Sequence, residues 1–181
     1  MKLFLDTCVL YPTVMREMLI GAAKAGAFTP LWSDRVFEEW RRAALRHGPG
    51  AGVEVQGECA LLNASFPSAA VKINADQEAR FWLPDPADIH VIAGAVIGSA
   101  DGIVTLNNKD FPAQILAEEQ LSRVNPDALL LGFWHAHPEL ITGVAIAILD
   151  NARKLSCKDW RLGQLLKKAQ LHRLALAVDP K

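Results

Sequence analysis

The chain has 181 residues, of which 51% are hydrophobic, and it carries a formal net charge of −1. This composition excludes an intrinsically disordered chain, and the small net charge gives no general attraction to nucleic acid. No apolar run reaches the roughly 20 residues that span a bilayer and no signal peptide is recognised, so we expect a cytoplasmic protein without membrane association.

The first half of the chain predicts short strands that alternate with helices. Leu3–Asp6 is apolar and too short for a helix, so it predicts a buried strand that ends on a carboxylate. Ser33 or Asp34 is placed to cap the helix that follows the second strand. In chain order we expect a helix over 13–25, a strand within 28–33, a helix over 35–47, a Gly-rich surface loop over 48–57, a helix over 58–65 and a strand over 69–73.

The second half predicts one more helix and strand, followed by helices alone. Asp85-Pro86 begins an apolar helix that runs to about residue 100, and Ile103–Thr105 predicts a strand. Repeated helix-then-strand units indicate an α/β fold, a three-layer α/β/α arrangement around a short parallel sheet. Beyond Pro126, helical periodicity predicts a C-terminal helical hairpin. We expect a domain over residues 1–125 and a helical extension over 126–181 packed on it.

Acidic side chains follow two of the predicted strands. Asp6 ends the first strand, and Asp110 lies five residues after Thr105. Ligands of open parallel sheets bind outside the carboxyl ends of the strands, so these two carboxylates are expected at one edge. Two unit charges ~4 Å apart repel by about 4 kcal/mol at an effective dielectric near 20. A hard cation such as Mg²⁺ or Mn²⁺, bound by carboxylates and water, removes this repulsion.

Two further acidic pairs leave a choice of ligand. Glu39 borders the apolar stripe of its predicted helix, whereas Glu38 lies on a charged face with neighbouring arginines, so we select Glu39. Asp85 is explained as the N-cap before Pro86. Taken alone, Asp88 would also be interpreted as a helix cap. It is favoured as a metal ligand only because Asp6 and Asp110 are expected to lie near it.

Four segments in this order resemble the PIN-domain nucleases, a family that includes the VapC-type toxins of bacterial toxin–antitoxin pairs. They read FLDTCVL, SDRVFEEW, DPADIHVIAGAV and ADGIVTLNNKDF, and the resemblance covers residues 2 to about 125. The positions that match the family pattern are Asp6, Glu39, Asp88, Thr105, Asn107, Asp110 and Phe111. Cys8 stands where the family usually has Asn, so the contacts of that amide must be lost or rerouted. The C-terminal helices resemble a subgroup with a helical extension.

The resemblance implies an endoribonuclease that depends on Mg²⁺ or Mn²⁺, the toxin of a toxin–antitoxin pair. Asp6, Asp88 and Asp110 would hold the metal, with Glu39 as a ligand or as a base that orients water. Thr105 and Asn107 would orient a ligand or the phosphate. The implied partners are the RNA substrate, an antitoxin protein and a second copy of the chain.

Other interpretations of the same residues stay open. Arg16 and Arg42 are candidates for contacts to the RNA backbone, although basic helix faces are equally typical of an ordinary soluble surface. The alternative function is a catalytically silent PIN-like module that binds RNA or protein, and Cys8 is the feature that favours it. A phosphatase-like enzyme with Asp6 as nucleophile is disfavoured, because Cys8 replaces the expected acid two residues later.

Overall fold

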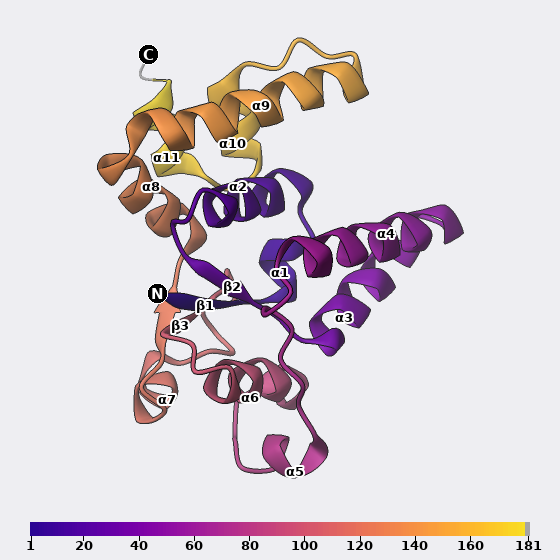
Figure 1. Cartoon of the computed structure of the whole chain (residues 1–181), viewed down its shortest axis with the longest axis vertical. Coiled ribbons are helices and arrows are strands. Elements are labelled where there is room, and N and C mark those ends of the chain that lie inside the picture. Colours follow the sequence, from indigo (N-terminus) through magenta and orange to yellow (C-terminus); the bar gives the residue numbers. More distant parts are fainter. Residues whose placement is uncertain (180–181) are drawn as a thin grey trace. The chain divides into compact units, whose positions relative to one another are not determined.

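The protein contains a four-stranded sheet in which every neighbouring pair of strands is parallel. The computed structural model describes residues 1–179, and within them the strand order is β2-β1-β3-β4. The strands are β1 (Lys2–Leu5), β2 (Thr29–Leu31), β3 (Gly102–Val104) and β4 (Ser122–Val124). The predicted parallel sheet is therefore confirmed, and β1 lies in its interior beside both β2 and β3 (Figure 1).

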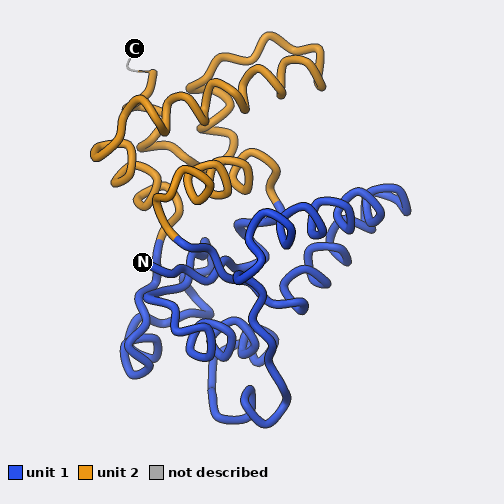
Figure 2. The backbone as a smooth tube through the Cα atoms, viewed as in Figure 1, with its two compact units in different colours: residues 1–11, 29–124 blue, residues 12–28, 125–181 orange. Residues whose placement is uncertain are grey.

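The described chain forms two compact units, coloured separately in Figure 2, and the sheet belongs to the first. This unit comprises residues 1–11 and 29–124. Its helices are α1 (Thr7–Leu10), α3 (Asp34–Leu45), α4 (Pro49–Ser65), α5 (Ala75–Glu78), the 3₁₀ turn η1 (Pro86–Asp88), α6 (Ile89–Ile97) and α7 (Ala113–Glu118). Helix α6 packs against β1 and β3, and α4 lies on the opposite side of the sheet (Figure 1), as the predicted three-layer fold requires.

The second unit is helical and takes in residues 12–28 together with the chain from residue 125 onward. It contains α2 (Thr13–Lys24), α8 (Pro126–Ala136), α9 (Pro138–Ser156), α10 (Leu162–Lys168) and α11 (His172–Val178). Helix α2 packs against α8, α9 and α10. The predicted C-terminal helices are confirmed, while a domain boundary at residues 125–126 stays a prediction. No helix among the described residues is both long enough and apolar enough to span a membrane.

The register of the two interior strands explains how the sheet places polar side chains at one edge. Leu3 and Phe4 in β1, and Ile103 in β3, are completely buried, which is expected of strands covered on both faces. Leu5 pairs with Val104 at the carboxyl ends of these strands. The next residue of each chain segment, Asp6 and Thr105, therefore follows the sheet at the same edge.

Two predicted elements between residues 48 and 73 are wrong. The Gly-rich segment is not a surface loop, because helix α4 runs from Pro49 to Ser65. A Cβ at Gly52 would lie 2.6 Å from Leu45 Cδ2, so this glycine allows close approach of α3 and α4 rather than a turn. The predicted strand over 69–73 is reduced to one bridge between Ala70 and Trp32.

The contact between α6 and β1 provides a test of the core. A Cβ at Gly94 would lie 2.5 Å from Cε2 and 2.6 Å from Cζ of the fully buried Phe4. Gly94→Ala should therefore lower the free energy of unfolding by about 1–3 kcal/mol through overpacking, measured by urea unfolding. Gly57→Ala in α4, which meets nothing within 4 Å, should instead stabilise the protein by about 0.5–1 kcal/mol. Equal stability of the two variants would contradict this packing.

Candidate functional site

Asp6 is a buried carboxylate that binds side chains rather than capping a helix. It occupies the N-cap position of α1, but its side chain makes no capping hydrogen bond. Its Oδ2 accepts hydrogen bonds from Thr105 Oγ1 at 2.7 Å and from Cys8 Sγ at 3.0 Å. Only 6% of the residue is exposed. Asp6 is thus fixed to the loop that follows β3, and a purely structural role as a cap has no support.

Cys8 connects Asp6 to the same loop. Its Sγ donates to Asp6 and accepts a hydrogen bond from the backbone N–H of Leu106 at 3.2 Å. Burial and the charge of Asp6 raise the pKa of the thiol to about 12, so Cys8 stays protonated near neutral pH and remains a donor. Cys8 therefore links Asp6 to the loop after β3 through its sulfur.

Three carboxylates meet here, one from this loop and two from the segment that begins α6. One carboxylate oxygen from each of Asp85, Asp88 and Asp110 lies within 4.8 Å of the other two. Asp85 is the N-cap of the 3₁₀ turn η1 and Asp88 is its last residue, and in such a turn side chains three residues apart lie above one another. Asn107 Nδ2 donates to Asp88 Oδ2 at 3.1 Å and to Asp110 Oδ2 at 2.8 Å. The amide of Asn107 therefore holds two of the carboxylates together.

The charges at this cluster repel one another. Burial, and after it the charges of Asp6, Asp85, Asp110 and Glu39, together raise the pKa of Asp88 to about 6. Within residues 1–179, neither Asp6, Asp88 nor Asp110 forms an ion pair with Lys or Arg. The donors are all hard oxygen atoms, so the chemistry of the cluster fits a cation such as Mg²⁺ or Mn²⁺.

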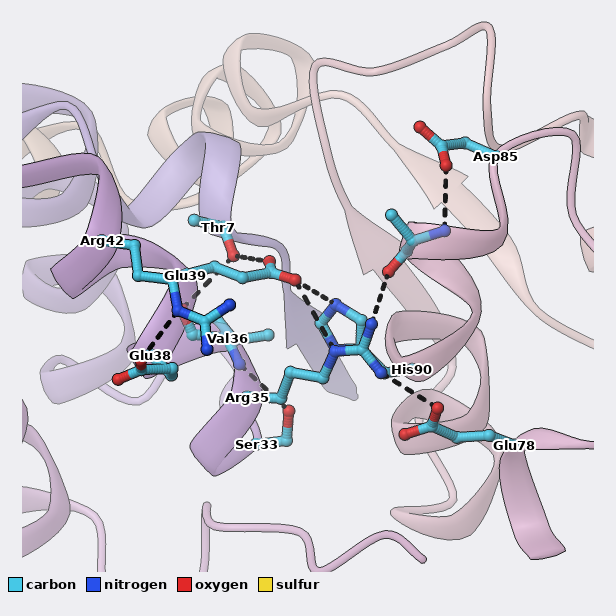
Figure 3. Close-up of polar contacts among 11 residues, drawn as sticks. Thr7, Ser33, Arg35, Val36, Glu38, Glu39, Arg42, Glu78, Asp85 and His90 are labelled. Atoms are coloured by element: carbon cyan, nitrogen blue, oxygen red, sulfur yellow. Dashed lines mark hydrogen bonds and ion pairs between the residues drawn. The ribbon is translucent and has the colours of Figure 1, made fainter. Parts of the chain in front are cut away.

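Glu39 is held from three sides (Figure 3). Its Oε2 accepts from Thr7 Oγ1 at 2.8 Å, and its Oε1 lies 2.8 Å from Nε2 of His90 and 3.8 Å from Nε of Arg35. Burial opposes ionisation of Glu39, but His90, Thr7 and Arg35 outweigh it and hold the pKa of the carboxyl below its usual value. Glu39 is therefore a carboxylate near neutral pH.

The choice between the two glutamates agrees with this geometry. Glu38 binds Arg41 and Arg42, each at 2.8 Å, and hydrogen bonds from these arginines lower its pKa to about 2. It belongs to a surface ion-pair group, as predicted. The side chain of Arg42 is 71% exposed, whereas Arg16 in α2 is 5% exposed and lies in the second unit. A role for either arginine in binding substrate stays a prediction.

Sequence reasoning missed three residues around the cluster. His90 is completely buried against Glu39, and neither ring nitrogen has a well-aligned hydrogen bond among the described residues. Arg35 reaches Glu78 at 3.0 Å and the backbone oxygen of Ala87 at 3.3 Å. Asp85 caps the N–H of Ala87 and also joins the carboxylate cluster.

Hydrogen bonds connect five of the seven positions of the family pattern. Asp6 is linked to Thr105, and Asp88 and Asp110 are linked to Asn107, whose backbone N–H donates to Thr105 Oγ1 at 2.9 Å. Asp6 and Glu39 lie outside the set of carboxylates within 4.8 Å of one another, although both raise the pKa of Asp88. Phe111, the remaining position, is completely buried.

A comparison with protein families finds one matching profile, described as the PIN domain, over residues 2–109. This span contains Asp6, Glu39, Asp88, Thr105 and Asn107, and it stops one residue before Asp110. No curated protein and no solved structure matches the chain. The resemblance noted in the sequence motifs is thereby confirmed for more than half of the chain.

The pKa of Asp88 predicts how the metal-free protein responds to pH. The folded-state pKa of about 6 exceeds the ordinary value of 3.8. Its contribution to stability is full below pH 3.8 and is lost as the pH rises through about 6. Asp88→Asn, which stays neutral, should be more stable than the native protein above this range and should lose less stability across it. The measurement is urea unfolding in EDTA as a function of pH.

The control for that series is Asp76→Asn, which removes an exposed carboxylate from α5. It should leave the pH dependence of the native protein unchanged. If the stability of the native protein changes with pH between the two pKa values in the same way as that of Asp88→Asn, the raised pKa of Asp88 is contradicted.

The environment of Cys8 predicts its reactivity. Because its pKa is raised to about 12, the thiolate that reacts with iodoacetamide is scarce near neutral pH. Cys157 is exposed and serves as an internal control. Mass spectrometry of the native protein should show Cys157 alkylated at least about tenfold faster than Cys8, and unfolding in urea should remove the difference. Similar native rates would contradict the contacts assigned to the Cys8 thiol.

Proposed function

This chain belongs to the PIN-domain family, whose members are generally nucleases, and from that premise we propose that it is a divalent-metal-dependent endoribonuclease that hydrolyses RNA phosphodiester bonds. The observation that carries the proposal is the cluster of carboxylates beside Asn107, which forms no ion pair with Lys or Arg within the described chain. Gathering such charges without a basic partner is unfavourable unless a cation is bound.

The proposed metal ligands are Asp6, Asp88 and Asp110, with Asp85 as an additional candidate from the cluster. When bound, Mg²⁺ or Mn²⁺ supplies positive charge at the phosphate and lowers the pKa of a coordinated water. The protein's own contribution is to orient the carboxylates. Asn107 donates to both Asp88 and Asp110, and Thr105 and Cys8 orient the carboxylate of Asp6 by donating to its Oδ2.

Glu39 has a role that follows from its pKa. The pKa of this carboxyl lies below its usual value, which makes it a weak proton acceptor. We therefore assign Glu39 to orienting water or to the metal rather than to general-base catalysis. Thr7 and His90 fix its position by contacting both oxygens (Figure 3).

Within this proposal, we assign the protein more narrowly as the toxin of a toxin–antitoxin pair that acts on RNA in the cytoplasm. Its support is the resemblance of the four motifs to VapC-type toxins. Large apolar side chains on the helical unit are exposed, including Ile146 at 46% and Leu176 at 59%, and such surfaces are typical of protein interfaces. An antitoxin or a second copy of the chain is the partner that this assignment requires. Arg42 remains the candidate for a contact to the RNA backbone.

The second candidate is a silent PIN-like module that binds RNA or protein, and Cys8 is the observation that favours it. Cys8 nevertheless keeps the contacts that attach Asp6 to the loop after β3. The substitution therefore leaves the carboxylates oriented, which favours the enzyme over the silent module.

Removing one carboxylate tests the enzyme directly. Asp6→Asn and Asp88→Asn should each lower the rate of Mn²⁺-dependent cleavage of a single-stranded RNA by at least about 100-fold, because each loses charge that binds the metal. Cleavage is measured by gel electrophoresis of end-labelled RNA, with EDTA as the metal-free arm.

Asp76→Asn is the matched control, since it makes the same chemical change on the exposed surface of α5. It should cleave RNA at the parental rate. Circular dichroism checks that all variants are folded. Parental cleavage by folded Asp6→Asn, or cleavage that persists in EDTA, would refute the assignment of the site.

A further inference from the structure

The charge of the chain is strongly segregated along the sequence. Residues 153–173 carry seven Lys and Arg side chains and one Asp. The other 160 residues carry 12 basic and 19 acidic side chains, so the remainder of the chain repels a polyanion. An anionic polymer attracted to this protein should therefore favour residues 153–173.

The cations of this segment are exposed and mostly unpaired. They lie at the end of α9, in the connection to α10, in α10 itself and in α11. The chain turns back between α9 and α10 (Figure 1). All seven are exposed: Arg153, Lys154, Lys158, Arg161, Lys167, Lys168 and Arg173. Arg153 lies 3.6 Å from Asp159, and the other six form no ion pair with any residue that the structure describes. Their charge is available to a ligand.

An aromatic ring lies among these cations. Lys168 Nζ is 5.0 Å and Lys158 Nζ is 5.9 Å from the ring centroid of Trp160. The indole is fixed by its own hydrogen bond, in which Nε1 donates to Ser156 Oγ at 3.0 Å. An aromatic ring flanked by cations is the combination that binds single-stranded nucleic acid, because the base stacks while the cations contact the phosphates.

The same ring borders an apolar groove of about 420 Å³. The groove belongs entirely to the helical unit, and its lining includes Val14, Ala152, Leu155, Trp160, Leu165 and Lys168. Leu155 is 87% exposed. A volume in this range accommodates a small planar group. Apolar side chains, the ring of Trp160 and the cation of Lys168 thus line one groove, and Lys158 lies near the same ring.

From these observations we infer that the cationic groove, formed by this pocket and the basic side chains of residues 153–173, binds single-stranded RNA outside the carboxylate cluster. One base packs against Trp160 and the phosphates contact the surrounding cations. This inference rests on the proposed function, since it supplies a second contact to the same class of substrate. RNA is favoured over an acidic protein segment because the cations surround an aromatic ring rather than a purely aliphatic surface.

The test is fluorescence anisotropy of a labelled oligouridylate in EDTA, which separates binding from cleavage. The triple variant Lys158→Glu, Lys167→Glu and Lys168→Glu should weaken binding by at least about tenfold. The logarithm of its association constant should fall less steeply with the logarithm of the salt concentration, by about 2 in slope. Trp160→Ala should weaken binding by about tenfold, and Trp160→Phe should restore most of it because the ring is retained.

The matched control is Lys2→Glu, Lys72→Glu and Arg80→Glu, which makes the same change of charge at exposed positions in the first unit. Its affinity for RNA should stay within about twofold of the native protein. Equal weakening by both triple variants would overturn the proposal. Displacement of the RNA by polyglutamate of equal charge, as effectively as by unlabelled RNA, would also overturn it and assign the groove to an acidic protein.

A second readout separates this proposal from the nuclease assignment. The Lys158, Lys167 and Lys168 triple variant should cleave a dinucleotide at the native rate, because a dinucleotide is too short to need the groove. If the protein cleaves RNA but this variant binds oligouridylate normally, the groove assignment fails alone. If RNA binds at the groove and no RNA is cleaved, the nuclease assignment fails alone.

Discussion

Mutual repulsion among carboxylates at the carboxyl edge of the sheet is the constraint on which the site depends. Two adjacent parallel strands end in register, so the residues that follow them share one edge. The 3₁₀ turn before α6 adds Asp85 and Asp88, and the loop after β3 adds Asp110. The amide of Asn107 and the hydroxyl of Thr105 orient these charges without neutralising them. Burial and the remaining repulsion together raise the pKa of Asp88.

The parts of the fold that could be predicted are those in which one local pattern decides the structure. Leu3–Leu5 and Ile103–Val104 are short apolar runs that end on polar residues, and both are buried strands. Ser33 accepts the N–H of Val36 at the start of α3, as a capping residue should. The choice of Glu39 over Glu38 followed from helical periodicity in the same way. In each case the residues adjacent in the sequence are sufficient to predict the local structure.

The missed features depend on contacts between distant segments. Glycine usually marks a loop, but Gly52 lies in a helix because it allows α4 to approach Leu45 of α3. His90 has no ligand spacing, and its significance arises from Glu39, which is brought against it by the fold. Asp85 is sufficiently explained as an N-cap, and its place in the carboxylate cluster depends on the fold, which brings Asp110 beside it. The i, i+3 spacing of Asp85 and Asp88 was the available signal.

The central claim is that the carboxylates beside Asn107 hold a divalent cation, and anomalous diffraction from crystals soaked in Mn²⁺ tests it most directly. The account predicts a manganese peak bounded by the carboxylates of Asp88 and Asp110, with the Asn107 amide no longer donating to both of them. Diffraction at saturating Mn²⁺ that shows no peak at these carboxylates, with Asn107 still bridging them, would contradict it.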